Sequence, residues 1–462
     1  MVPPVSNAKT LSSLSESKIK SSFWSPLTEI EISTLRNTPL AKTGDPDALL
    51  ALAIMASGDI RTEAQYAEIK NTVRKFVKRI KPRLSAEKNT ARKGFLLYSA
   101  MHGEFFSSHL SGDDLKAYRA NQSRLTEIFR SQTFNCISSS LLYLILARYF
   151  DLMVEGVILP SHSFVQLTTP ESQVIEIETT SRRGYGLRHN EAFYENSASH
   201  WSQLRGLPDI SYEDYLNREI VSAFQLITEN MNHQHTTSGR LAQRDRYRLN
   251  EIRAWLLPQD FEAQRNRLYV FNNELIRLIE KKDYQSASKL LNIAKSSIRY
   301  YKQALTSGQN LDNAIHDSIA FMFAARAEIA LADDNYPDAI YNYKQALQWV
   351  NDPEQDLRLR QNISIAWLQQ GNHFFSQQDY ASAIAHYVKA QNKHNNNQLK
   401  QTIDDNISSA FWNMAVAHLN TGDIYSAYDL LSQCRSQYPH IEQCQKKMDE
   451  ICQSYSLADC RR

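Results

Sequence analysis

The spacing of apolar residues predicts helices along most of the chain and strands in one short stretch. In the N-terminal part, apolar positions recur every three or four residues, the period of an amphipathic helix. A short apolar helix is expected over 49–54, and a second helix over 64–81 that Pro82 should end. After Cys136, the run 141–149 is apolar on nearly all sides and predicts a buried helix.

The pattern changes to alternation between residues 154 and 177. Strands are expected at 154–159, where Pro160 ends the first of them, and then at 163–167 and 174–177. In the third strand Ile175 and Ile177 should face inward. A buried helix followed by antiparallel strands indicates an α+β domain.

The C-terminal half repeats one pattern of large and small residues. Its anchor residues Ala339, Ala383 and Ala427 lie 44 positions apart. Each follows an aromatic residue in a first helix and precedes a large and then a small residue in a second helix. These positions hold Phe323, Tyr343 and Ala346, then Trp367, Tyr387 and Ala390, then Phe411, Leu431 and Cys434. A fourth, looser unit holds Phe271, Leu275, Ala287, Leu291 and Ala294.

This pattern resembles tetratricopeptide repeats, in which small side chains let paired helices approach closely. The resemblance implies an all-α solenoid that binds a protein or peptide. Because the period exceeds the usual ~34 residues, we expect an extended second helix or a longer loop between repeats. An ordinary helical bundle is the alternative.

Composition shifts divide the chain into four parts. The polar, Ser-rich start at 1–28 is expected to be a flexible leader, and 29–228 an α+β domain with a helical N-terminal part. The polar stretch 229–262 indicates a linker, and 263–462 the solenoid of about four units.

The overall charge and hydrophobicity exclude several classes of protein. A formal net charge of +2 and the lack of a binding motif argue against nucleic acid as a partner. No apolar run reaches the ~18 residues of a membrane span, and no signal peptide is recognisable. We expect a cytoplasmic protein; a non-classical secretion route would leave no mark in the sequence.

Residues 70–93 hold ten Lys or Arg against one acid, Glu87. An anionic partner or membrane surface would explain this run. A solvated helix face explains it more simply, because the opposite side carries an ordinary core stripe.

The cysteines and histidines predict no metal site and no cofactor. Four cysteines crowd the C-terminal end without a CxxC pair, and reduced thiols are favoured over disulfides or a metal site. His233 and His235 have no partner cluster in the sequence and are expected to face solvent.

The fifth cysteine, Cys136, begins the predicted buried helix, and a histidine and two acids follow it. A helix N-terminus favours the thiolate form of a cysteine, which is its nucleophilic form. His162 opens a predicted strand and is suited to take and return a proton. Glu176 or Glu178, two apart on the next strand and facing one way, would orient that imidazole.

Residues 134–165, with Asn-Cys-Ile-Ser and Leu-Pro-Ser-His-Ser-Phe-Val, resemble the bacterial transglutaminase-like superfamily. The resemblance covers about 90–220, extends more weakly to about 30, and implies a papain-like core. It implies Cys136 as nucleophile, His162 as base and Glu178 in the acid position. Such domains often precede tetratricopeptide repeats.

Three departures from the family pattern stand out. Ser161 replaces a common Gly, Glu178 replaces the commoner Asp, and Asp151 occupies a turn position where Gly is frequent. The oxyanion donors would be the Cys136 N–H and, as a candidate, Gln132.

Two functional hypotheses follow. The leading one is a cysteine hydrolase (protease or amidase) or an acyl-transfer enzyme whose repeats recruit a protein. The alternative is a non-catalytic scaffold with a degenerate transglutaminase-like domain. The sequence does not choose between water and an amine as acceptor.

Overall fold

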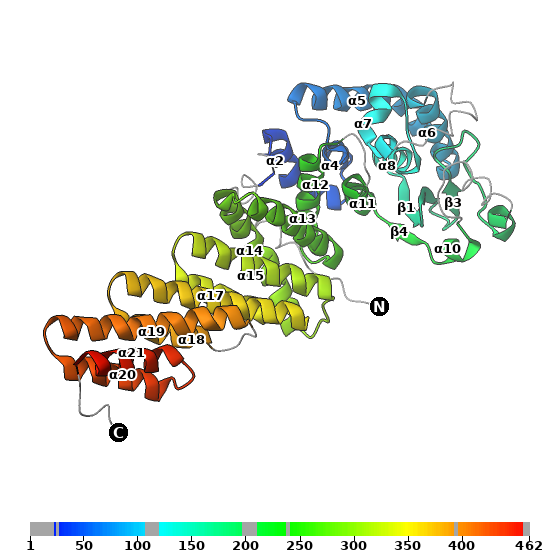
Figure 1. Ribbon diagram of the computed structural model, residues 1–462. Helices are drawn as coiled ribbons and strands as arrows, with labels where there is room; N and C mark the ends of the chain where they lie inside the picture. The colour runs from blue at the N-terminus through cyan, green and yellow to red at the C-terminus, as the bar shows by residue number, and fades with distance from the viewer. Residues whose placement is uncertain are drawn as a thin grey trace. The chain divides into compact units, whose positions relative to one another are not determined.

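The protein consists of two compact units, which are described separately (Figure 1). Unit 1 comprises Met1–Arg267 and unit 2 comprises Leu268–Arg462. The computed structural model describes residues 23–24, 27–106, 120–195, 210–236, 241–391 and 396–455.

Helices make up the N-terminal part of unit 1. They are α2 (Glu29–Arg36), α3 (Thr38–Lys42), α4 (Pro46–Ser57), α5 (Glu63–Ala86), α6 (Thr90–Phe105), the short 3₁₀ helix η2 (Ala120–Ser123), α7 (Leu125–Ser131) and α8 (Cys136–Arg148). The apolar helices predicted near residue 50 and after Cys136 are α4 and α8, and nearly all their side chains are buried.

The second predicted helix, α5, is longer than expected. Its core stripe contains Ile69, Val73, Phe76 and Ile80, as the sequence pattern indicates. Pro82, however, lies inside the helix rather than at its end. The side of α5 that carries Pro82 is exposed, so water can hydrate the carbonyl that the proline leaves without its helical N–H.

A four-stranded antiparallel sheet follows α8. Its strands are β1 (Met153–Leu159), β2 (His162–Thr168), β3 (Val174–Ile177) and β4 (Glu219–Val221), in the order β3-β2-β1-β4. The first three match the predicted strands, and β4 was not foreseen. Helix α8 packs on β1 and β2 (Figure 1).

A tight turn between β1 and β2 fixes the first residue of β2. Leu159 pairs with His162, so Pro160 and Ser161 form a two-residue connection. Ser161 has a left-handed backbone with φ 62°, and this explains why glycine is common there. Asp151 has φ 53°, in keeping with the tolerance of Asp for that region.

Two boundary predictions for unit 1 need correction. Residues 1–22 and 25–26 lie outside the described part, but Trp24 and Leu27 of the expected leader are buried. The expected linker 229–262 is mostly helical. Helices α11 (Ala223–Thr236) and α12 (Gln243–Leu256) cover most of this region, and α13 (Phe261–Glu280) begins at its end, before the division between the units. The short α10 (Tyr212–Leu216) precedes the region.

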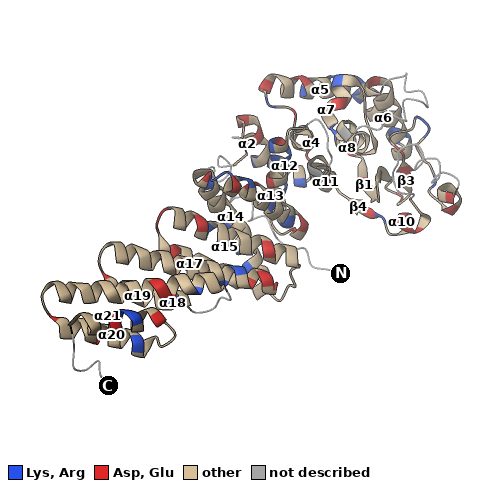
Figure 2. Cartoon of the chain, viewed as in Figure 1, with Lys and Arg blue, Asp and Glu red and all other residues tan. Residues whose placement is uncertain are grey.

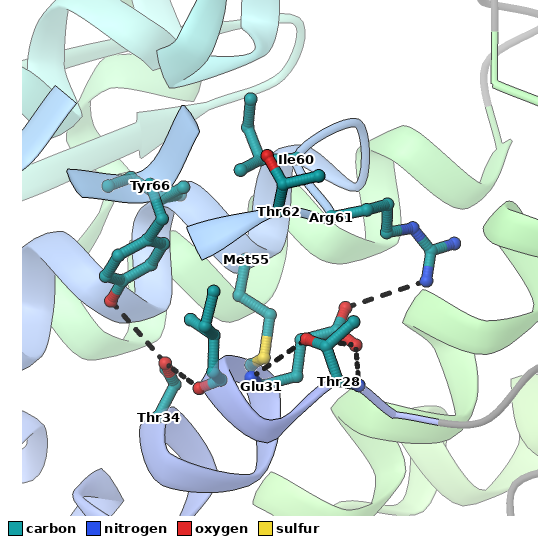
Figure 3. A pocket seen from close by; sticks show the side chains of 10 residues that line it. Thr28, Glu31, Thr34, Met55, Ile60, Arg61, Thr62 and Tyr66 are labelled. Atoms are coloured by element: carbon teal, nitrogen blue, oxygen red, sulfur yellow. Dashed lines mark hydrogen bonds and ion pairs between the residues drawn. The ribbon is translucent and has the colours of Figure 1, made fainter. Parts of the chain in front are cut away.

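Buried ion pairs explain why a polar sequence forms this interior helix. Arg248 of α12 is fully buried and pairs with the buried Glu31 of α2. Arg61 lies 3.8 Å from the same carboxylate (Figure 3). It also pairs with Asp245. Thr28 caps α2 through a reciprocal bond with Glu31. Because the buried charge of Arg248 is paired with Glu31 inside the unit, the polarity of 229–262 does not place it in solvent.

The sequence also predicted that two histidines in 229–262, His233 and His235, face solvent. His233 lies on α11 and is half-buried, whereas the sequence predicted that it faces solvent. The side chain of His235 lies outside the described residues.

Unit 2 is built from consecutive helices. After α13 come α14 (Tyr284–Thr306), α15 (Asn313–Ala332), α16 (Tyr336–Leu347), α17 (Pro353–Ser376), α18 (Tyr380–Gln391), α19 (Asn397–Asn420), α20 (Ile424–Gln437) and α21 (Glu442–Tyr455). Helices α16, α18 and α20 begin 44 residues apart, and their anchor alanines 339, 383 and 427 are fully buried.

In the three units with the 44-residue period, the extra length lies in the first helix of the pair. Helices α15, α17 and α19 have 20, 24 and 24 residues, whereas α16, α18 and α20 have 12, 12 and 14. The expectation of an extended second helix therefore fails for these three pairs, whereas in the looser first unit the second helix, α14, is itself long, with 23 residues. Close approach within a pair is visible at Gly371, where a Cβ would lie 2.5 Å from the Tyr387 ring.

The same tight turn joins the two helices of each pair. A residue with a left-handed backbone follows the first helix, and the next residue is Asp or Asn. The left-handed residues are Lys282, Asp334, Gln378 and Gly422. The N–H of the Asp or Asn donates to a carbonyl near the end of the first helix, and its side chain accepts from the second helix.

Three of the four C-terminal cysteines are disulfide-bonded, whereas the sequence favoured reduced thiols. Cys434 of α20 and Cys444 of α21 form a disulfide with Cα atoms 5.7 Å apart, and Cys452 is also disulfide-bonded. Cys460 lies outside the described residues. Because disulfides persist mainly in oxidising compartments, cysteine content no longer supports the cytoplasmic expectation. Within the described ranges, no helix has the length and apolar character to cross a membrane.

The basic segment 70–93 lies on α5 and the start of α6 (Figure 2). Three of its arginines pair with acids, Arg74 with Asp47, Arg79 with Glu104 and Arg92 with Glu87. Its exposed side chains include Lys75, Lys78, Lys81, Arg83 and Lys88. Contact with an anionic partner stays a prediction.

Replacing Glu31 with Gln should lower the free energy of unfolding of unit 1 by about 3 kcal/mol, because Arg248 would keep a buried charge without its carboxylate. The double variant Glu31→Gln/Arg248→Met should lose less than Glu31→Gln alone. Thermal unfolding of both variants measures this. Equal losses would show that the pair is not coupled.

Candidate active site

Cys136 is the first residue of α8, and a capping box holds it there. The Asn135 side chain accepts hydrogen bonds from the N–H groups of Ile137 and Ser138, at 3.0 and 3.2 Å. Ser138 Oγ in turn accepts from the Asn135 N–H at 3.1 Å. The Cys136 side chain is 3% exposed and is not disulfide-bonded. Its thiol therefore sits at a rigid helix N-terminus, where the backbone dipole favours an anion.

His162 lies between the cysteine and an acid. Its Nε2 atom is 2.8 Å from Oε1 of Glu178, and the imidazole also has a side-chain hydrogen bond with Cys136. The structure thus brings together Cys136, His162 and Glu178 in the order that a thiol–imidazole–acid relay requires.

Glu178 follows the last residue of β3 and is 7% exposed. Its N–H donates to the carbonyl of Gly184 at 2.9 Å. A Cβ on Gly184 would overlap the Glu178 backbone and come within 2.7 Å of the Glu178 Cβ. Glycine at 184 therefore permits the close approach that sets the carboxylate's position.

The two candidate acids face the same way, as the alternation predicted, but have different neighbours. Glu178 reaches His162, whereas Glu176 lies against His189 and accepts a hydrogen bond from Tyr215. Of the two carboxylates, Glu178 is the one in contact with His162.

Electrostatic interactions favour the charged forms of His162 and Glu178. Burial alone would lower the pKa of His162, but the charge of Glu178 and hydrogen bonds to Cys136 and Glu178 raise it. Burial would likewise raise the pKa of Glu178, yet His162 and His189 lower it. The imidazolium and the carboxylate thus stabilise each other.

A buried hydroxyl cluster ties the start of α8 to the residue after Glu178. The Oγ atoms of Ser139 and Ser140 lie 2.7 and 3.1 Å from Oγ1 of Thr179. All three side chains are fully buried. Because Ser139 and Thr179 are close in sequence to Cys136 and Glu178, these bonds fix the thiol and the acid relative to each other.

Gln132 is the remaining candidate. It is the left-handed C-cap of α7, with φ 55°, and its side chain is exposed. None of the hydrogen bonds recorded for the described residues joins its side chain to Cys136, His162 or Glu178. Its role as an oxyanion donor stays a prediction.

Sequence reasoning missed His189 and Thr179. Thr179 stands next to Glu178, but nothing in its residue type marks it as a packing partner for serines 40 positions earlier. His189 precedes a short helix in an irregular segment, where no periodicity indicates which way a side chain points. Only the fold brings these residues to the site.

Comparison with protein families identifies one domain in the chain. Residues 67–194 match the transglutaminase-like superfamily. The chain therefore contains a transglutaminase-like domain, which holds Cys136, His162, Glu178 and His189. No curated protein matches the chain.

Gly184→Ala should displace Glu178 and lower the free energy of unfolding by about 2 kcal/mol, because the new methyl group overlaps backbone atoms. The matched control is Gly103→Ala in α6, where a Cβ meets nothing within 4 Å. The control should stabilise the protein by about 0.5 kcal/mol through helix propensity. Chemical unfolding compares them, and equal effects would contradict the close approach at Gly184.

The contribution of His162 to the free energy of unfolding should decrease as the pH rises. Its raised pKa gives a contribution that is complete below the ordinary value of 6.5 and is lost as the pH rises through the folded value. The lowered pKa of Glu178 gives a contribution that is complete above 4.5 and is lost as the pH falls. The pair should therefore stabilise most between pH 4.5 and 6.5.

Unfolding of the wild type and His162→Gln measures this. The difference should be largest near pH ~5.5 and smaller at pH ~8.5. His233→Gln is the control: burial lowers the pKa of His233, so the advantage of the wild type over this variant should shrink as the pH falls. A difference for His162→Gln that grows with rising pH would contradict the assignment of charge.

Proposed function

We propose that unit 1 is a cysteine hydrolase of papain-like mechanism, acting on an amide or isopeptide bond. One observation carries the proposal: the His162 imidazole bonds to both Cys136 and Glu178. The match to the transglutaminase-like superfamily supports it. In this proposal Cys136 is the nucleophile, His162 the acid–base and Glu178 the acid that orients the imidazole.

The reaction begins with the thiolate–imidazolium pair. The Cys136 sulfur attacks the carbonyl carbon, and the C–N bond then breaks as His162 donates its proton to the leaving amine. This leaves a thioester and a neutral imidazole. His162 next takes a proton from water, whose oxygen attacks the thioester, and the carboxylic acid leaves as the thiolate is restored. An amine in place of water would give acyl transfer.

The helix start limits where an oxyanion can be bound. The Asn135 cap uses the N–H groups of Ile137 and Ser138. A backbone donor from this helix end would therefore be the N–H of Cys136 itself. Gln132, four residues earlier, is the proposed second donor.

Unit 2 is proposed to be a tetratricopeptide-type solenoid that recruits a protein substrate or partner. The support is the 44-residue spacing of the starts of α16, α18 and α20 and the buried small residues at equivalent positions. Such repeats stack to form an extended binding surface. The resemblance carries no information on which protein is bound.

One observation favours a second candidate function. The Cys136 side chain is only 3% exposed, so a substrate carbonyl has little direct access to the sulfur. A non-catalytic domain that displays the repeats as a scaffold would need no such access. Catalysis by Cys136 separates the two candidates.

The test is cleavage of a mixed peptide pool in heavy-oxygen water, read by mass spectrometry. A hydrolase should produce new C-termini that carry one heavy oxygen, and Cys136→Ala should produce none. Adding a primary amine to the same reaction reveals acyl transfer as amine-capped C-termini. Absence of both products from the wild type and from Cys136→Ala alike would favour the scaffold.

The controls separate the proposed roles. Glu178→Gln keeps a hydrogen-bond acceptor for His162 but removes its charge, and should lower kcat about 100-fold or more. Cys434→Ser, in unit 2, should leave cleavage of short peptides unchanged, because that residue is remote in sequence and lies outside the transglutaminase-like domain. Loss of activity in Cys434→Ser equal to that in Cys136→Ala would contradict the assignment of chemistry to unit 1.

A further inference from the structure

His189 occupies a buried position between the two acids. Its Nδ1 atom is 3.0 Å from Oε2 of Glu176, and its Nε2 atom is 3.2 Å from Oε1 of Glu178. Its side chain is 0% exposed. The same Oε1 atom of Glu178 is the one that His162 contacts at 2.8 Å. One carboxylate oxygen is thus shared by two imidazoles.

Hydrogen-bond stoichiometry determines the charge of His189. A neutral imidazole has one donor and one acceptor, and an ionised carboxylate only accepts. Two ionised carboxylates, one at each ring nitrogen, therefore require both nitrogens to carry a proton. Glu176 and Glu178 both have lowered pKa values, although burial alone would raise them, because His189 bonds to Glu176 and both His162 and His189 bond to Glu178. With a carboxylate oxygen at each ring nitrogen, His189 favours the imidazolium form: burial would lower its pKa, but the hydrogen bonds to Glu176 and Glu178 raise it.

Aromatic rings hold this cation in place. The His189 ring lies 4.3 Å from Phe164 and 4.8 Å from Phe193, measured between centroids. On the far side of Glu176, Tyr215 donates to its Oε1 atom at 2.6 Å. The titratable and charged groups around His189 in the described structure are Glu176, Glu178, Tyr194, Tyr215, His162 beyond Glu178, and Arg218 over the Tyr215 ring.

We propose that His189 is a positioning residue that sets the pH range in which Cys136 is a thiolate. Its cation fixes the Glu178 carboxylate toward His162 and offsets part of the negative charge that His162 and Cys136 experience. This inference rests on the proposed function, because it concerns the ionisation of the same thiol–imidazole pair.

The sign of the effect follows from electrostatics. Replacing His189 with neutral Gln keeps a polar side chain but removes one positive charge near the site. The more negative surroundings then disfavour the thiolate, so Cys136 should lose its proton at a higher pH. At an effective dielectric constant of ~20, a unit charge roughly 12 Å away corresponds to a shift of about one pH unit.

The experiment is a pH titration of thiolate ultraviolet absorbance in the full chain, with the spectrum of Cys136→Ala subtracted. His189→Gln should shift the midpoint upward by about one pH unit. His233→Gln, the same substitution outside the cluster, should leave the midpoint at the wild-type value. A folded His189→Gln with an unmoved midpoint would overturn the proposal, since a merely structural role changes stability and not the midpoint.

Nitrogen NMR of the wild-type histidines covers the case in which His189→Gln does not fold. His189 should show a proton on both ring nitrogens at about pH 7; an unprotonated ring nitrogen would overturn the proposal. These readouts also separate the two proposals. Peptide cleavage with an unmoved midpoint in His189→Gln refutes only the role of His189, whereas a doubly protonated His189 without cleavage refutes only the hydrolase.

Discussion

The site depends on the contacts of the Glu178 carboxylate, which is buried at the end of β3. A buried carboxylate is costly unless cations or hydrogen-bond donors surround it. Here His162 and His189 meet the same oxygen, and the Glu178 backbone rests against Gly184. The charge of Glu178 favours an imidazolium at His162, and in the proposed mechanism this imidazolium stabilises a thiolate at Cys136.

The surrounding fold keeps these groups in register. The two-residue turn at 160–161 makes His162 the first residue of β2, and the Asn135 capping box makes Cys136 the first residue of α8. Bonds from Ser139 and Ser140 to Thr179 then join that helix to the segment carrying the acid. Preorganisation of this kind lets a relay act without rearranging at each step. It also explains why the cluster lies in the packed interior of the domain.

Sequence patterns predicted the elements of unit 1 better than its long-range contacts. Period and residue type predicted α8, the first three strands and the positions of Cys136 and His162, because these are local signals. Alternation placed Glu176 and Glu178 on one face but could not choose between them. The choice depends on where the turn at Gly184 and the segment around His189 fold back, and neither has a periodic signal.

The larger errors of the sequence-based prediction concern long-range contacts and helix lengths, and in unit 1 the cause was a buried charge. The polar stretch 229–262 predicted a linker, yet α12 lies in the interior because Arg248 pairs with Glu31 from the other end of the unit. In unit 2 the 44-residue spacing was visible in the sequence, but in the three units that carry it the extra length lies in the first helix rather than the second. The pairing of Cys434 with Cys444 was also missed, because it depends on how α20 and α21 meet.

The most direct test of the central claim is the rate at which iodoacetamide alkylates Cys136 near pH ~6, below the ordinary thiol pKa. Mass spectrometry would compare the native wild type with His162→Ala. An ion-paired thiolate predicts modification that is fast in the wild type and at least ~10-fold slower in His162→Ala. Equal rates in the two proteins, rising with pH as for an ordinary thiol, would contradict the relay and leave unit 1 without a nucleophile.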